Sequence, residues 1–204
     1  MHALVIGGTG MLADVSLWLV RKGYDVSVIA RRRARMKQLI DCAGQMASIN
    51  PLLVDYRDQE ALCSLISRAI QKNGTFALII AWVHTDGNQA LSTVIQKNSG
   101  HSRLCTLYRC IRRNAVIQKN SGHSGPWRLF HVLGSRADPA EAKSELCLPV
   151  TCLYRQVQLG FVVEEYGSRW LTHQEISGGV IDAIRRDAPF HLVGTLEPSK
   201  KRPR

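Results

Sequence analysis

Three glycines near the N-terminus form the first pattern in the sequence that could bind a ligand. Gly7, Gly8 and Gly10 follow a short apolar run at residues 3–6. Ala13 lies three residues further on, inside a segment with helical spacing of apolar residues. Glycines at such a turn let the backbone approach a ligand, and the helix behind them directs unpaired N–H groups and its positive dipole end at one point. The pattern predicts a site for the pyrophosphate of a dinucleotide, with a tight turn in an unliganded α/β domain as the alternative.

Three consecutive arginines follow the second apolar run, which spans residues 26–30. They are Arg31, Arg32 and Arg33, and no acidic residue accompanies them. Dinucleotide-binding folds that select NAD usually carry an acidic residue here, which accepts a hydrogen bond from the ribose 2′-hydroxyl. Guanidinium groups instead match the oxygens of a 2′-phosphate. The sequence therefore predicts NADP(H) in preference to NAD(H), unless only Arg31 faces the site and its neighbours coat a solvated helix start.

Alternating apolar runs and helical patterns predict the elements that position these residues. Four apolar runs separated by three helical patterns occupy roughly the first eighty residues, and right-handed crossovers then require a parallel sheet. Residues 128–135 continue as a fifth strand, residues 172–187 as a helix and residues 190–194 as a last strand. The predicted fold class is α/β, a single Rossmann-like doubly wound parallel sheet in three α/β/α layers. It would occupy residues 1–197, followed by a basic tail at residues 198–204.

Composition limits the other classes of function. The chain has 204 residues, a hydrophobic share of 45% and a net charge of +11, and no run of eighteen apolar residues that could span a membrane. The first residues pass straight into a strand without a signal-peptide pattern, so we expect a cytoplasmic protein with reduced cysteines. Neither the cysteines nor the histidines have the spacing of metal ligands. The basic segments could touch nucleic acid, but no recognised motif accompanies them, so we expect no nucleic-acid partner, no membrane partner and no metal.

A repeated segment interrupts the middle of the chain. Residues 94–102 read VIQKNSGHS and recur unchanged at residues 116–124. Two copies are too few for a repeat fold, and glycine in each copy indicates the end of a helix. We interpret residues 103–124 as a duplication inserted between the fourth crossover helix and the fifth strand, with a basic lid or partner surface as the alternative.

The N-terminal motifs together resemble the short-chain dehydrogenase/reductase family. The resemblance depends on residues 4–12, on the arginines after the second strand, on Asp55 at the end of the third strand, and on residues 80–82. It is specific over residues 1–86 and looser beyond. The resemblance implies that the first turn holds the pyrophosphate, that basic residues hold the 2′-phosphate, that the strand-end acid contacts adenine and that the fourth strand lines the ribose. These roles fall respectively on Gly7, Thr9, Gly10, Met11 and Leu12; on Arg31 and Arg32; on Asp55; and on Ala81 and Trp82.

The same resemblance implies two catalytic residues and also weakens one of them. Ser135 stands where the family places the serine that polarises the substrate carbonyl, and Tyr154 begins a Tyr-x-x-x-Gln segment where the family has Tyr-x-x-x-Lys. The amide of Gln158 cannot favour a phenolate electrostatically, because the unperturbed phenol pKa is about 10. The residues after Tyr154 also alternate as in a strand, so a buried or edge-strand tyrosine is the competing interpretation.

The predicted function is therefore that of an NADP(H)-dependent oxidoreductase of short-chain dehydrogenase type, which acts on a small carbonyl or alcohol. Ser135 and Tyr154 would face the reacting oxygen. Because Gln158 replaces the family's lysine, a non-catalytic NADP(H)-binding sensor or scaffold is the alternative. Members of the family commonly pair through exposed helices, which leaves a homo-oligomer open.

Overall fold

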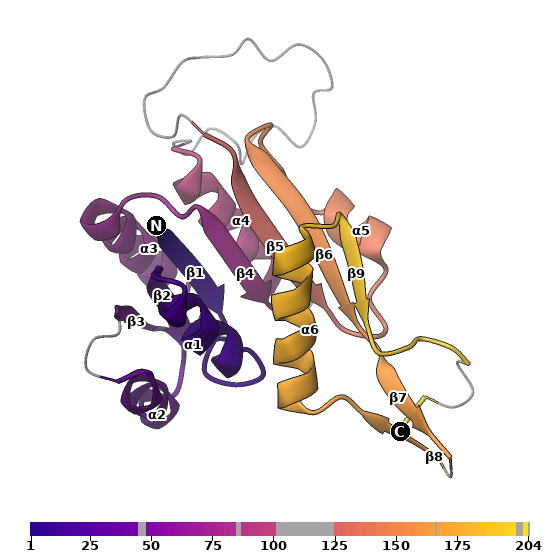
Figure 1. The fold of residues 1–204 in the computed structure, drawn as a ribbon. Helices are drawn as coiled ribbons and strands as arrows, with labels where there is room; N and C mark the ends of the chain where they lie inside the picture. The colour runs from indigo at the N-terminus through magenta and orange to yellow at the C-terminus, as the bar shows by residue number, and fades with distance from the viewer. Residues whose placement is uncertain (45–47, 85–86, 101–124, 166, 199–201, 204) are drawn as a thin grey trace, which may run out of the picture.

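A seven-stranded sheet forms the centre of the molecule (Figure 1). The computed structural model describes residues 1–44, 48–84, 87–100, 125–165, 167–198 and 202–203. The strand order is β3-β2-β1-β4-β5-β6-β9, and every neighbouring pair is parallel. The strands are β1 (His2–Ile6), β2 (Asp25–Ala30), β3 (Ile49–Leu53), β4 (Leu78–Trp82), β5 (Trp127–Leu133), β6 (Cys152–Leu159) and β9 (Phe190–Val193). The predicted doubly wound parallel sheet is confirmed.

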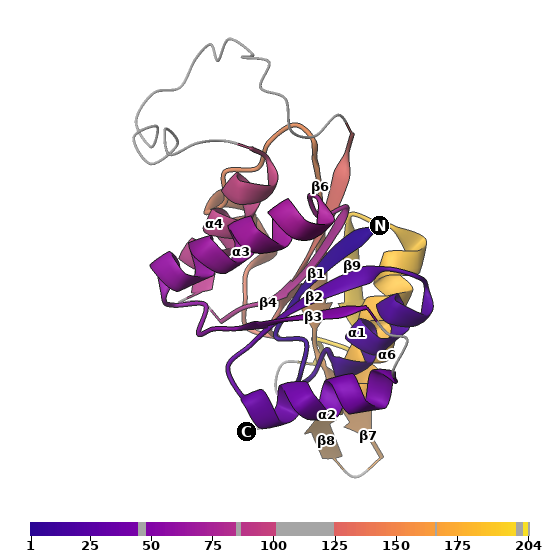
Figure 2. The ribbon, with the colours of Figure 1, turned by 90° about the vertical axis from the view of Figure 1, so that its left-hand side faces the viewer.

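Helices cover both faces of this sheet and complete three layers (Figure 2). One face packs against α1 (Ala13–Arg21), α2 (Arg33–Ala43) and α6 (His173–Arg186), and the other against α3 (Gln59–Asn73) and α4 (Asn88–Asn98). The short helix α5 (Pro139–Ser144) follows β5. Central strands must be apolar on both faces in such an arrangement. In β1, Ala3 and Val5 join the core under α1, whereas Leu4 and Ile6 join the core under α3 and α4.

Local sequence signals fix the helix ends. The side chain of Asp58 accepts a hydrogen bond from the Ala61 amide at the start of α3, and α6 begins with a capping box formed by Thr172 and Glu175. The first copy of the repeat ends α4, and Gly100 follows with φ of 69°. This confirms glycine as the stop signal in that copy. The predicted insertion at residues 103–124 and the second copy lie outside the described residues.

A two-stranded antiparallel hairpin projects from the same end of the sheet as the carboxyl ends of the central strands (Figure 1). It consists of β7 (Phe161–Glu164) and β8 (Gly167–Trp170). The alternating residues 157–163 therefore belong to two strands, because Gly160 separates β6 from β7. A Cβ at Gly160 would lie 2.1 Å from the carbonyl oxygen of Thr195, so only glycine fits there. No helix among the described residues has the length and apolarity that a bilayer crossing requires.

Candidate functional site

A cleft of about 250 Å³ lies at the carboxyl ends of β1, β2 and β4. This is the edge at which open parallel α/β sheets bind ligands. The cleft brings together glycines of the first turn, arginines that follow β2, and side chains from the ends of β3, β4 and the loop before α6. Its lining residues are Gly7, Thr9, Gly10, Met11, Ile29, Ala30, Arg31, Arg32, Arg35, Val54, Tyr56, Trp82, His84 and His173.

The glycine turn at one side of the cleft is held tightly against the sheet. Gly7 has φ of 81°, and a Cβ there would lie 3.3 Å from the backbone oxygen of Trp82. A Cβ at Gly8 would lie 2.6 Å from Oγ of Ser16, and that hydroxyl donates to the Gly8 carbonyl at 3.1 Å. Gly10 is different, because its Cβ would meet no atom closer than 3.9 Å. The first two glycines therefore fix the turn, and the third leaves room where a ligand would lie.

Backbone amides at this turn suit an anion. The amide of Gly10 donates to the Gly7 carbonyl and the amide of Ala13 to the Gly10 carbonyl. Within the described part of the chain, no hydrogen bond uses the amides of Met11 or Leu12, which immediately precede α1. Unpaired amides at a helix start carry the positive end of the helix dipole. They fit a phosphate group of a dinucleotide.

Three arginines form the cationic wall of the cleft. Arg31 and Arg32 follow β2, and Arg35 extends from the first turn of α2 so that Nη1 lies 4.0 Å from the position of a Cβ on Gly10. Arg31 also forms an ion pair with Asp55, at 3.6 Å between Nη1 and Oδ2. Arg33 does not line the cleft. Arg35 was not among the predicted site residues, although its position three residues after Arg32 on a helix places both on one side.

Other predicted residues lie close to the cleft without lining it. Leu12 and Ala81 are fully buried and are not among the lining residues. Because β3 ends at Leu53, Asp55 lies beyond the strand, where Oδ1 accepts a hydrogen bond from the Arg57 amide. Tyr56, which the sequence did not single out, lines the cleft beside Asp55.

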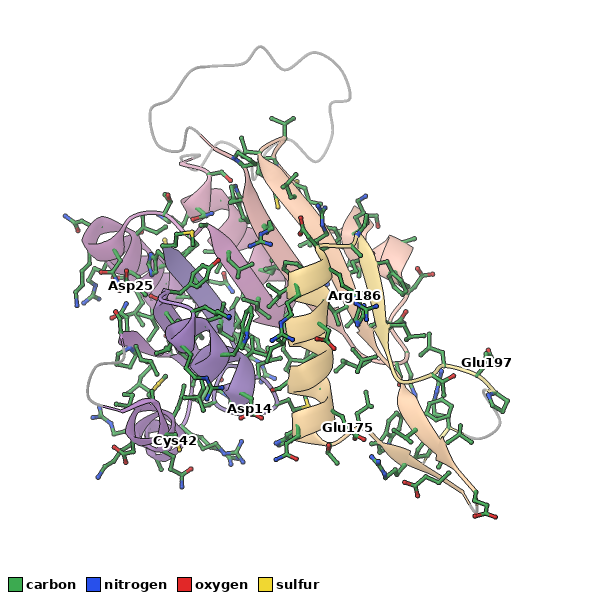
Figure 3. The ribbon with its side chains drawn as sticks, viewed as in Figure 1. Asp14, Asp25, Cys42, Glu175, Arg186 and Glu197 are labelled. Atoms are coloured by element: carbon green, nitrogen blue, oxygen red, sulfur yellow. The ribbon has the colours of Figure 1, made fainter. Side chains whose placement is uncertain are left out.

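Two histidines also line the cleft. His84 follows β4, where its ring meets the Trp82 ring edge-on at 5.9 Å, and His173 begins α6. The start of α6 is anchored twice: Ser177 Oγ donates to the Met11 carbonyl at 2.6 Å, and Arg169 of the hairpin makes two hydrogen bonds to Glu175. Glu175 lies at the end of α6 nearer the hairpin (Figure 3). The described residues contain no His, Cys, Asp or Glu cluster that could hold a metal ion.

Solved structures with the same architecture are dehydrogenases and reductases. A short-chain dehydrogenase/reductase from Serratia marcescens is 16% identical with a TM-score of 0.61, and 89% of each chain is covered. A Brucella melitensis protein described as a short-chain dehydrogenase/reductase of glucose/ribitol dehydrogenase type has a TM-score of 0.65 at 8% identity, covering 95% of this chain and 94% of that one. A variant of actinorhodin polyketide ketoreductase with NADPH has a TM-score of 0.61 at 14% identity, with 95% of each chain covered.

This chain has the short-chain dehydrogenase/reductase fold. The resemblance seen in the sequence is thereby confirmed at the level of the fold. No protein-family model matches the chain, and neither does any curated protein.

Ser135 lies two residues beyond the end of β5 and is not among the residues that line the cleft. A Cβ on the preceding residue, Gly134, would lie 3.9 Å from the Trp82 ring. Two buried amides of β6 hold the loop that follows: Gln158 donates to the Ala137 carbonyl at 2.9 Å, and Gln156 donates to the Pro139 carbonyl at 2.6 Å. Gln158, which the sequence analysis matched to the family's lysine, lies in β6 and holds the loop that carries Ser135.

Tyr154 lies elsewhere, and the expected pairing of Ser135 with Tyr154 is not formed. Tyr154 is in β6 opposite Leu129, and the end of β5 at Leu133 is four residues further on. Four residues of strand span about 13 Å. The cause is the shortness of α5, which has six residues, so that β6 has already begun at Cys152. Tyr154 therefore lies well back from the end of β5 that carries Ser135.

The Tyr154 hydroxyl instead completes a buried polar cluster. It lies 2.9 Å from Nδ1 of His131 and accepts from the Gln156 amide at 3.1 Å. Burial raises the pKa of Tyr154 to about 12, and burial lowers the pKa of His131 to about 4. Both groups are therefore neutral near pH 7. This is a structural pairing rather than a proton-transfer site.

Replacing Tyr154 with phenylalanine is expected to lower stability and leave function unchanged. The substitution removes the hydrogen-bond partner of the His131 nitrogen and one of the two partners of the Gln156 amide, which keeps its bond to the Pro139 carbonyl. We expect the free energy of unfolding to fall by about 1–2 kcal/mol, measured by urea unfolding. NADPH binding and any turnover should stay within about twofold, because the hydroxyl is remote from the cleft. Loss of turnover with unchanged stability would return Tyr154 to a catalytic role.

Burial of His131 predicts a specific pH dependence of stability. Because the folded pKa of about 4 is lower than the 6.5 of an ordinary histidine, the unfolded chain takes up this proton first as pH falls. The stability is complete above pH 6.5 and is lost progressively toward pH 4. Between pH 7.5 and 5.5 the loss through this residue is expected to be about 1.3 kcal/mol. In urea unfolding, the free energy of unfolding of His131→Gln should change between these two pH values by that much less than the free energy of the parent protein. An equal change in the two proteins would contradict the prediction.

Proposed function

We propose that this chain is an NADP(H)-dependent dehydrogenase/reductase that acts on a small carbonyl or alcohol. The observation that carries the proposal is the cleft itself, in which unpaired amides before α1 face a wall of three arginines. The ketoreductase that shares the fold is described with NADPH, which is consistent with this cofactor.

The residues of the cleft fit the cofactor part by part. The amides of Met11 and Leu12 would hold the pyrophosphate, and the close contact of Gly7 with Trp82 keeps side chains out of its place. Arg31, Arg32 and Arg35 supply donors for the 2′-phosphate, and the described residues that line the cleft include no carboxylate to accept from an unmodified ribose. Asp55 is beside the cleft but already paired with Arg31.

The chain's own side chains would orient the substrate and move the proton. When bound, the nicotinamide supplies the hydride chemistry that no side chain provides. The Ser135 hydroxyl, carried by a loop that Gln158 holds, can donate to the carbonyl oxygen of the substrate. His84 and His173 also line the cleft, and an imidazole can act as a general acid or base toward a bound substrate.

A second candidate is an NADP(H)-binding protein without turnover. The specific observation that favours it is the position of Tyr154, which is bonded to His131 and removed from the cleft. Binding would then be the function, and the glycine turn and the arginines would serve both candidates equally.

Two measurements test the proposal and separate the candidates. Fluorescence titration of the purified chain with NADPH and with NADH should show tighter binding of NADPH, by about tenfold or more for one added charge-assisted contact. The chain is then assayed with a panel of aldehydes and ketones, and NADPH oxidation is monitored by absorbance. We expect turnover of at least one compound and its loss in Ser135→Ala. Binding without turnover on the whole panel favours the second candidate, and indifference to both nucleotides overturns both.

A further inference from the structure

Arg202, in the basic tail, lies beside the loop that follows β5. Arg202 is half-buried, and its Nη2 donates to the backbone carbonyl of Ser135 at 3.3 Å. The tail begins after β9, where Thr195 pairs with Phe161 at the base of the hairpin. A guanidinium group therefore lies directly beside the residue proposed to bind the substrate oxygen.

Part of this guanidinium is buried without a partner among the described residues. Its Nε is buried and has no hydrogen-bond partner, and no ion pair among the described residues includes Arg202. An arginine carries five N–H donors, and burial of a cation without a counter-charge is unfavourable. An anionic ligand at this place would supply the missing partner.

The cofactor phosphates are bound at a different place. The glycine turn follows β1 and the three arginines of the cleft follow β2, whereas Ser135 follows β5. In the sheet order, β4 separates β5 from β1, which corresponds to about 10 Å between β1 and β5. Ser135 and Arg202 are not among the lining residues, but a Cβ on Gly134 would lie 3.9 Å from the ring of Trp82, which does line the cleft. Arg202, bonded to Ser135, therefore lies near the Trp82 side of the cleft, away from the proposed phosphate positions.

We propose that Arg202 binds an anionic group of the substrate, so that the substrate is a small carbonyl or alcohol bearing a carboxylate or phosphate. The inference rests on the proposed function, because it assumes that the substrate binds beside Ser135. The oxyanion would accept from the free donors of Arg202 while the carbonyl of the substrate faces Ser135. Carboxylate and phosphate share this chemistry, and the test has one arm for each.

The test compares each anionic compound with a neutral counterpart. For carboxylate the pair is 4-formylbenzoate and its methyl ester, and for phosphate it is glyceraldehyde 3-phosphate and glyceraldehyde. Binding to the NADP⁺-loaded protein is measured by ligand-observed NMR, and turnover by NADPH absorbance. We expect one anionic compound to bind at least about tenfold more tightly than its counterpart, and Arg202→Gln to remove that advantage without changing the affinity for the neutral compound.

Arg136→Gln is the matched control, since Arg136 is exposed, adjacent to Ser135 and identical in charge change. Arg136→Gln should change the affinity for the anionic compound and the affinity for its neutral counterpart by no more than about twofold each. Equal affinity for both members of each pair, or equal losses in the two variants, would overturn the role of Arg202. So would equal losses for anionic and neutral compounds in Arg202→Gln, which would indicate a structural role. NADPH titration of the same proteins separates these results from a failure of the proposed function, in which no nucleotide binds.

Discussion

Replacing Gly10 with aspartate is expected to abolish NADPH binding while the fold stays intact. A side chain at this position enters open space, because the nearest atoms to its Cβ are the Gly7 carbonyl oxygen at 3.9 Å and Arg35 Nη1 at 4.0 Å. The new carboxylate would lie in front of the amides that precede α1, where the pyrophosphate is expected, and would pair with Arg35. We expect NADPH to bind at least about 100-fold more weakly, which corresponds to about 2.7 kcal/mol.

Gly10→Ala is the control, because its methyl group adds bulk without charge. We expect a loss of less than about tenfold, and melting temperatures within about 2 °C of the parent for both variants. Gly8 would be a poor choice for the same experiment, since a Cβ there would lie 2.6 Å from Ser16 Oγ and disturb the packing of α1. Retention of NADPH binding by the aspartate variant would remove the glycine turn from the cofactor site.

Sequence reasoning succeeded where a residue's role follows from its immediate neighbours. The alternation of buried runs and helical patterns is a local signal, and it yielded the parallel sheet, the turn after β1 and the arginines after β2. The capping box at Thr172 and the glycine after α4 are equally local. These features need only a few consecutive residues to be recognised.

It failed where position depends on lengths of elements or on contacts across the fold. The alternation after Tyr154 did indicate a strand, and the tyrosine lies in β6. Nothing nearby says that α5 is only six residues long, which is what keeps Tyr154 away from Ser135. His173 reaches the cleft only because α6 packs beside α1, from the other end of the chain. Arg202 is the extreme case, since it contacts Ser135, which lies 67 positions earlier in the chain. The sequence showed only that Arg202 belongs to a basic tail.

Replacing Arg32 with glutamate is expected to change the choice of cofactor. Arg32 lines the cleft directly after β2, and unlike Arg31 it forms none of the ion pairs of the described residues, so its removal frees no carboxylate. Loss of a charge-assisted hydrogen bond to the 2′-phosphate, together with the repulsion from the new carboxylate, should weaken NADPH binding about 30-fold, or about 2 kcal/mol. NADH has no 2′-phosphate, so its dissociation constant should change by no more than about twofold.

Arg33 provides the control that separates a contact from a change in net charge. Arg33→Glu makes the same charge reversal one residue along the chain, but Arg33 does not line the cleft. We expect it to weaken NADPH binding less than about threefold, and that small effect should disappear at high salt because surface charges are screened. Equal effects of the two variants would mean that the basic surface attracts the nucleotide only in a general way. Equal weakening of NADPH and NADH by Arg32→Glu would place the 2′-phosphate elsewhere, and Arg35 would become the residue to change next.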